Sequence, residues 1–320
     1  MSPLFSALFT GWEWRVDVLI VLLTLTALYL SGWLRLRRRG AKLANGWRLA
    51  AYLSGIFLLA LAIMSPIDAL GGQLLFMHMI QHKIVVMAAA PLLWLGNPFP
   101  IGLWALPTVA RRPVASLFTH HSPFRQALTA VTQPGIAWLV FIFVYIGWHD
   151  GNLYNQALQK DWVHDIQHIT FFLAAMLFWW HVVGAAPHLH KRLPAWAVVA
   201  YLLLAVPPNA IAGVAIAGTP EVIYTYYNSV PRIWGFTAIE DQMTAGAIMW
   251  IQGSEMLIQA ALIVIAVNWV RAGKGQQSQS GATISDEALI APGLEHRVLQ
   301  NKWRQANADR LKHRDSVQAS

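Results

Sequence analysis

The chain has 320 residues, of which 56% are hydrophobic and only 12% are charged. Soluble domains carry about 25% charged residues, so this composition excludes an ordinary soluble protein and indicates one that crosses a membrane several times. The net charge of +8 does not indicate nucleic acid, because the basic residues fall in short segments between apolar runs. The absence of cysteine excludes disulfides and thiolate metal sites.

Seven apolar runs approach the length of about 20 residues that a helix needs to cross the hydrocarbon core of a membrane. Each predicts a transmembrane helix, at 16–34, 47–65, 73–95, 134–149, 162–184, 195–217 and 241–270. The predicted fold class is therefore all-α, a polytopic membrane bundle of seven transmembrane helices within residues 1–270. Residues 271–320 are expected to form a cytoplasmic, partly flexible tail. The Pro207-Pro208 pair predicts a kink in the sixth run, because proline lacks a backbone donor.

The distribution of lysine and arginine predicts the orientation. Most of the 23 basic residues fall on one side of the predicted membrane, whereas the opposite side holds only Arg15, Lys160 and Arg232. Cytoplasmic loops carry the excess of basic residues in membrane proteins. We therefore expect the N-terminus outside and the C-terminus in the cytoplasm.

Histidines gather near the outer ends of the predicted spans. His78 and His82 are four residues apart in the third run, and His164 and His168 repeat this spacing in the fifth. Residues four apart project from the same face of a helix. Ionisable groups inside a membrane are costly and usually face the bundle interior, where they pair or bind an ion. We predict a metal site from six residues: His78, His82, His149, His164, His168 and Asp241.

Other interpretations of these residues stay open at this point. A single histidine in a membrane helix is more often a hydrogen-bonded interior group than a ligand, and Asp241 is equally suited to capping the last helix. Lys83 is expected to lie off the ligand face and to snorkel or pair with a carboxylate. The thioethers of Met77, Met79 and Met243 fall at a suitable depth for a soft ion, although methionine mostly serves packing.

Imidazole suits copper, zinc, iron and nickel, and spacing alone does not choose among them. A site open to the outside would meet copper or, as the alternative, zinc. Three histidines around zinc, with Asp241 activating water, would make an intramembrane hydrolase. A haem-b electron carrier with two axial histidines is a weaker alternative, because it needs no pairs at four-residue spacing. A scaffold without metal is the remaining one.

Several motifs resemble one family when taken together. They are His78-Met-Ile-Gln-His82, the Ala-Pro-Leu-Leu-x-Leu-Gly-x-Pro stretch through Pro98, Trp148-His149, His164-x-x-x-His168, Trp179-Trp180 and Asp241-Gln-Met-Thr-Ala-Gly-Ala-Ile-Met-Trp250. In order and spacing they resemble the CtaG family of cytochrome c oxidase assembly proteins, the caa3-type CtaG group, over about residues 70–255.

The resemblance implies a multi-pass protein of the bacterial inner (plasma) membrane that matures haem–copper oxidase. It implies copper delivery to the CuB centre in cytochrome c oxidase subunit I, with periplasmic copper donors as further partners. On this interpretation the protein is a metallochaperone rather than an enzyme, its surroundings are the lipid bilayer, and it binds no nucleic acid.

Overall fold

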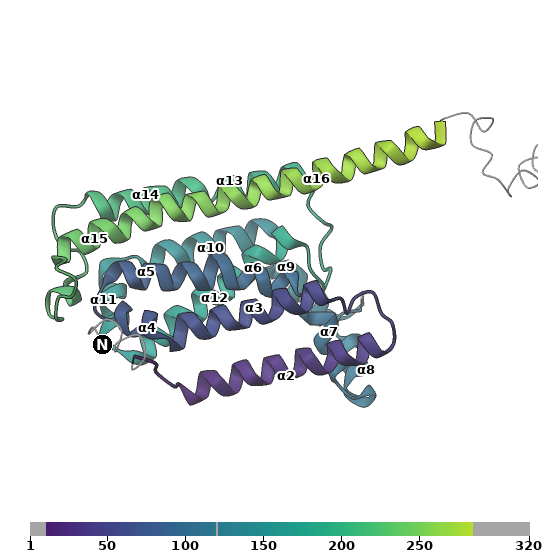
Figure 1. Ribbon diagram of the computed structural model, residues 1–320, viewed down its shortest axis with the longest axis horizontal. Helices are drawn as coiled ribbons and strands as arrows, with labels where there is room; N and C mark the ends of the chain where they lie inside the picture. The colour runs from purple at the N-terminus through teal and green to yellow at the C-terminus, as the bar shows by residue number, and fades with distance from the viewer. Residues whose placement is uncertain (1–10, 120, 284–320) are drawn as a thin grey trace, which may run out of the picture. The chain divides into compact units, whose positions relative to one another are not determined.

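The computed structural model describes residues 11–119 and 121–283, and every regular element in these ranges is helical (Figure 1). The prediction of an all-α fold is confirmed. Residues 284–320, most of the predicted cytoplasmic tail, lie outside the described residues, and the orientation and domain division stay predictions. The contacts and the candidate site described below lie within the compact unit that ends at Val264.

Six spans in the described part of the chain are long and apolar enough to cross a membrane. They are Val16–Arg38 (α2), Gly46–Met64 (α3), Leu75–Leu95, Asp161–Val183 (α12), Ala195–Gly218 and Ala238–Ala272. A seventh arises if Pro123–Val131 (α9) and Pro134–Trp148 (α10), bent by 56°, count as one span. The predicted bundle of seven transmembrane helices agrees with this count of six or seven.

Three of these spans are interrupted helices. Leu75–Leu95 consists of α5 (Leu75–Lys83), the π-helical η1 (Ile84–Ala89) and α6 (Ala90–Leu95). Ala238–Ala272 contains α15 (Ala238–Ala247), the π-helical η3 (Ile248–Gln252) and part of α16 (Gly253–Thr283). The span Ala195–Gly218 is interrupted between α13 (Ala195–Leu203) and α14 (Val206–Gly218), directly before the Pro207-Pro208 pair at which a kink was predicted.

Shorter helices connect the spans at both ends. They are α4 (Pro66–Gly71), α7 (Pro98–Ala105), α8 (Thr108–Ser116), α11 (Gly151–Gln159) and the 3-10 turn η2 (Thr225–Asn228).

The span Leu75–Leu95 is the most buried of the six and contributes residues to two hydrophobic clusters of the core. Met87 and Ala90 pack into one hydrophobic cluster with α10, α12 and α14, whereas Val85, Ala89 and Leu93 pack into a second cluster with α2 and α3. Positions three or four apart share a helix face, so the two sets lie on different faces of the span. Its histidines are therefore held between neighbouring helices rather than toward lipid.

Candidate metal centre

The carboxylate of Asp241 in α15 fixes the first turn of α5. Leu74 precedes α5 in extended conformation and provides no side-chain cap. Instead the Leu75 N–H donates to Asp241 Oδ2 at 2.9 Å, and the Phe76 N–H donates to Oδ1 at 3.0 Å. Arg232 Nη2 donates to the same Oδ2 at 2.9 Å. Asp241 is fully buried, so these donors compensate its charge and anchor α5 just before His78.

α5 turns both of its histidines into the protein. The exposed fractions of His78 and His82 are 1% and 6%, and their ring centroids lie 4.5 Å apart. The four-residue spacing accounts for the shared face, and the packing of α5 against α15 and α12 accounts for the burial.

α12 presents a matching pair from the opposite side. The Nε2 atoms of His164 and His168 lie 3.1 Å apart, within hydrogen-bond distance. The His168 ring centroid lies 4.9 Å from that of His82, and the His164 centroid lies 5.2 Å from that of His78. The four imidazoles of α5 and α12 thus form one cluster across the helix–helix interface.

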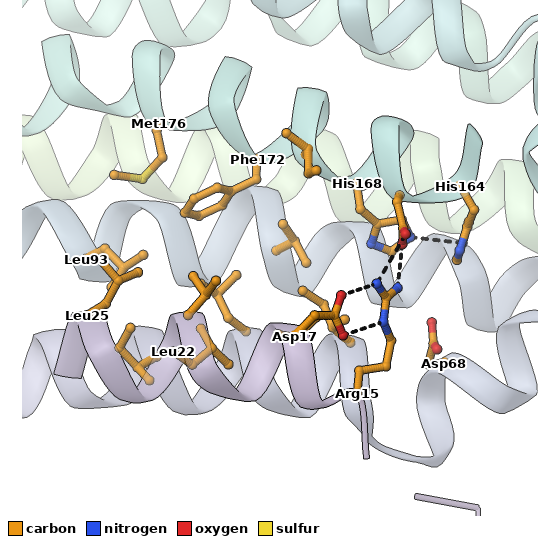
Figure 2. A pocket seen from close by; sticks show the side chains of 18 of the residues that line it. Arg15, Asp17, Leu22, Leu25, Asp68, Leu93, His164, His168, Phe172 and Met176 are labelled. Carbon is orange, nitrogen blue, oxygen red and sulfur yellow. Dashed lines mark hydrogen bonds and ion pairs between the residues drawn. The ribbon is translucent and has the colours of Figure 1, made fainter. Parts of the chain in front are cut away.

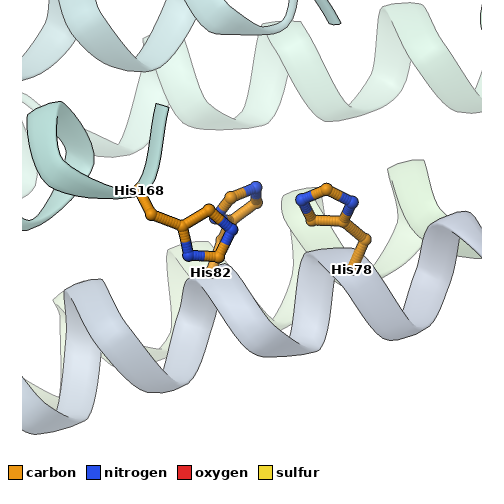
Figure 3. A group of neighbouring side chains, drawn as sticks. All are labelled: His78, His82 and His168. Carbon is orange, nitrogen blue, oxygen red and sulfur yellow. The ribbon is translucent and has the colours of Figure 1, made fainter. Parts of the chain in front are cut away.

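Three of the four imidazoles bring ligand atoms within 4.8 Å of one another: His78, His82 and His168, the histidine trio. Figure 3 shows the three rings projecting into the space between α5 and α12. Each of these three imidazoles can supply one nitrogen as a ligand to the same cation.

The trio also carries unused hydrogen-bonding capacity. His78 Nε2 and both ring nitrogens of His82 are buried and have no hydrogen-bond partner among the described residues. Buried polar groups are nearly always partnered, because leaving one unpaired costs about 1–3 kcal/mol. His78 and His82 therefore each have a buried nitrogen free to bind a metal ion, and the absence of cysteine leaves imidazole as the donor type.

His149 lies beside the cluster rather than in it. It follows the last residue of α10, and its Nδ1 lies 2.6 Å from the Tyr145 carbonyl. Its ring and that of His82 both pack against Phe171, at centroid distances of 6.0 and 4.6 Å. The unpartnered Nε2 of His149 borders a small cavity that His82 also lines. Of the six residues predicted as ligands, three fall outside the trio: His164, which lies beside it in the cluster, and His149 and Asp241.

The surroundings of Lys83 differ from those predicted. Its side chain is buried, and Nζ lies 3.4 Å from Asn209 Oδ1 and 3.5 Å from the Met249 carbonyl. Within the described ranges it forms no ion pair, so the expected snorkelling or carboxylate pairing is wrong. Of the three methionines at suitable depth, Met79 is buried beside His82, whereas Met243 is 51% exposed.

A groove of about 600 Å³ leads to the histidines from the side, between α2 and α12. Figure 2 shows that Arg15, Asp17, Asp68 and the two α12 histidines gather at one end, and that apolar side chains line the rest. Asp165, next to His164, also belongs to the polar end. This end was not predicted, because no sequence pattern relates residue 15 to residue 165.

Charges at the polar end of the groove are largely matched. Arg15 donates to both carboxylate oxygens of Asp165 and pairs with Asp17 at 2.6 Å. The hydrogen bonds that the guanidinium donates, first to Asp165 and then to Asp17, raise the pKa of Arg15. Burial raises the pKa of Asp68 to about 6, opposed by a hydrogen bond that Gln81 Nε2 donates to it.

Comparison with known proteins identifies the family to which the chain belongs. The model of the cytochrome c oxidase caa3 assembly factor family (Caa3_CtaG) matches residues 27–272, and the chain belongs to this family. Similar curated proteins are uncharacterized proteins of Mycobacterium bovis and Mycobacterium tuberculosis, each 28% identical over 266 residues, and one of Mycobacterium leprae at 26%. The matches cover 81% of this chain but only 39–40% of those relatives, so the chain spans about two fifths of their length. No solved structure matches.

Proposed function

We propose that this protein carries copper within the membrane and delivers it to the CuB centre of cytochrome c oxidase subunit I. His78, His82 and His168 hold the ion as cargo. The single observation that carries the proposal is the convergence of their ligand atoms, within 4.8 Å of one another, in a buried site that contains unpartnered nitrogens. Membership of an oxidase assembly factor family supports the choice of client.

Ligand chemistry supports copper as the ion. Imidazole binds copper well, and the chain has no cysteine with which a thiolate site would compete. The CuB centre is itself held by imidazoles inside the membrane. A transfer from one set of imidazoles to another changes the ligand type little, so neither site has to be much stronger than the other.

The proposed location is the bacterial inner membrane, with the histidines on the periplasmic side. The excess of lysine and arginine in the opposite loops supports this orientation. Periplasmic copper donors would then load the site, away from cytosolic thiols. The protein acts as a carrier and not as an enzyme.

The geometry of Asp241 favours the carrier over a zinc hydrolase. A hydrolase would need Asp241 as the base that activates water. Both oxygens of Asp241 instead accept hydrogen bonds from the start of α5 and from Arg232. Because these hydrogen bonds occupy both oxygens of Asp241, the carboxylate is not available to act as a base.

Copper binding by variants of the purified protein tests the proposal. We expect the detergent-purified native protein to bind Cu(I) in competition with a chromophoric chelator. His78→Ala or His168→Ala should weaken the affinity at least about tenfold. His188→Ala, at an exposed histidine remote in sequence from both pairs, is the control and should bind like the native protein. Equal affinity in all variants would contradict the ligand assignment.

A second experiment tests the delivery role in the host cell. Deletion of the gene should lower the copper content of CuB and the oxidase activity while the oxidase polypeptide is still made. Reintroducing the native chain should restore both, and reintroducing His78→Ala should not. Full CuB occupancy after deletion would rule out delivery.

A further inference from the structure

The histidine trio is closed off where the bundle ends. Tyr154 of α11 is fully buried, and its ring centroid lies 5.2 Å from that of His78. Tyr224 packs against Tyr154 at 4.5 Å, and the Tyr227 hydroxyl donates to the Gly71 carbonyl at 2.7 Å. Within the described residues, these tyrosines place α11 and the η2 segment over the cluster and cover it with buried aromatic rings.

On another side, the cluster borders the groove. Only two of the four clustered imidazoles line the groove, His164 and His168, both from α12. His164 and His168 are both half-buried, whereas His78 and His82 are buried. An ion coming from the groove therefore meets the α12 histidines before it can reach His78 or His82.

We propose that copper enters and leaves the trio sideways, through the polar end of the groove, with His164 as the transfer ligand that binds first and releases last. This inference rests on the proposed function, because it assigns a route and an order of ligands to the same site. His164 is thereby distinguished from the three resident ligands.

The distances suit a stepwise exchange of ligands. The Nε2 atoms of His164 and His168 are 3.1 Å apart, so an ion on one nitrogen lies within reach of the other after a small shift. The ion then exchanges one imidazole at a time and is never left without a ligand. No electron or proton has to be supplied, because the donor type stays neutral imidazole at each step.

The charges at the groove entrance permit a cation to pass. Arg15 lines the groove at this end, and its charge is matched by Asp165 and Asp17. Asp68 lines the same end and adds a further carboxylate. The entrance therefore does not repel a positive ion as an unpaired guanidinium would.

The first test separates the transfer ligand from the resident ligands. Native protein, His164→Leu and His78→Leu are purified in detergent without metal and mixed with Cu(I). Bound copper at equilibrium and the rate of loading are both measured. We expect His164→Leu to keep equilibrium copper within about threefold of the native protein while loading at least tenfold more slowly. His78→Leu should lose equilibrium copper itself.

The second test blocks the route without touching any histidine. Ile169→Trp on α12 and Val18→Trp on α2 place bulk on the two walls of the groove. Leu173→Trp and Ile20→Trp are the controls on the same helices, because neither residue lines the groove; Leu173 is about as exposed as Ile169, whereas Ile20 is more exposed than Val18. Loading should slow at least fivefold in the two groove variants only, with equal copper at equilibrium.

The outcomes distinguish the two proposals. If the native protein binds no copper, the proposed function fails and the route fails with it. If copper binds but His164→Leu loses it as His78→Leu does, His164 is a resident ligand and the transfer role is overturned. If copper binds and both groove variants load at the native rate, entry is not through the groove, while copper binding by the trio stands.

Discussion

The carboxylate of Asp241 caps a helix other than its own. Its Oδ2 accepts from the backbone N–H of Leu75, the first residue of α5, at 2.9 Å, although the two residues are 166 positions apart in the chain. The start of α15 is capped instead by Thr237, which forms a capping box with Glu240. The placement of His78 therefore depends on a contact between α5 and α15.

Asp241→Asn is expected to destabilise the protein without removing a copper ligand. The buried carboxylate is paired with Arg232, and losing one partner of a buried pair costs about 3–5 kcal/mol. The melting temperature of the detergent-purified variant should fall clearly, while copper per folded molecule stays near the native value. Glu240→Gln is the matched control and should cost about 1 kcal/mol or less, because Glu240 is exposed. Loss of copper from a fully folded Asp241→Asn variant would contradict this expectation and show that copper binding needs the carboxylate.

The buried position of Asp68 predicts a pH-dependent stability. Its pKa in the folded protein is about 6, above the ordinary value of 3.8. The Asp68 carboxyl thus holds its proton more tightly in the folded state than in the unfolded state. The stability that the protonated Asp68 contributes is complete below about pH 4 and is lost as pH rises through 6. Asp68→Asn removes this loss, because the amide stays neutral.

Thermal melts at two pH values measure the effect of Asp68→Asn. The variant should gain roughly 3 kcal/mol over the native protein at pH 8 and only roughly 1 kcal/mol at pH 4.5, from the difference in the two pKa values. Gln81 Nε2 already donates to this side chain, and the buried Gln81 Oε1 lacks a partner that an Asn amide would supply. A gain independent of pH would show that the carboxylate is not held protonated.

The crossing of α14 with α15 leaves no room for a side chain at Gly213. A Cβ placed there would lie 2.6 Å from the Trp250 nitrogen and 2.8 Å from the Gly246 carbonyl oxygen, both backbone atoms. Small residues permit such close approach of membrane helices. Gly213→Ala should therefore lower the melting temperature or abolish folding, at a cost of about 1–3 kcal/mol. Gly218→Ala on the same helix meets nothing within 4 Å and should behave as the native protein.

The amine of Lys83 is expected to contribute little to stability, whereas its partner Asn209 contributes much. The hydrogen bonds of Lys83 Nζ in the described residues are long, at 3.4 and 3.5 Å, and the amine lies 5.8 Å from the centroid of the Tyr145 ring. Replacing a buried charged group by an apolar one of similar volume is often neutral or stabilising, so Lys83→Met should retain or raise the melting temperature.

Asn209→Leu provides the contrast. Asn209 Oδ1 accepts from the Tyr145 hydroxyl at 2.6 Å, and Nδ2 donates to the Met249 carbonyl at 2.9 Å. Its loss leaves these buried groups unpaired and should cost about 1–3 kcal/mol each. A larger loss from Lys83→Met than from Asn209→Leu would show that the amine has a stabilising role that these contacts do not explain.

Periodicity along the chain was sufficient to predict the helices and the pairing within them. Apolar runs of membrane length predicted the spans, and the spacing of four predicted that His78 and His82 share one face, as do His164 and His168. Both are local properties, because a helix places every fourth residue on the same side whatever surrounds it. The Pro207-Pro208 pair likewise predicted where its span is interrupted, because proline lacks a backbone donor whatever helices surround it.

Which faces meet was decided by the tertiary structure alone. Side chains from α5 and α12 complement each other across an interface that no sequence spacing encodes, so His82 and His168 approach while His149 packs aside on Phe171. The same holds for Asp241, which caps α5, and for Arg15, which pairs with Asp165. Local hydrogen bonding determines helices, whereas packing between distant segments determines neighbours, and the candidate site is made of neighbours.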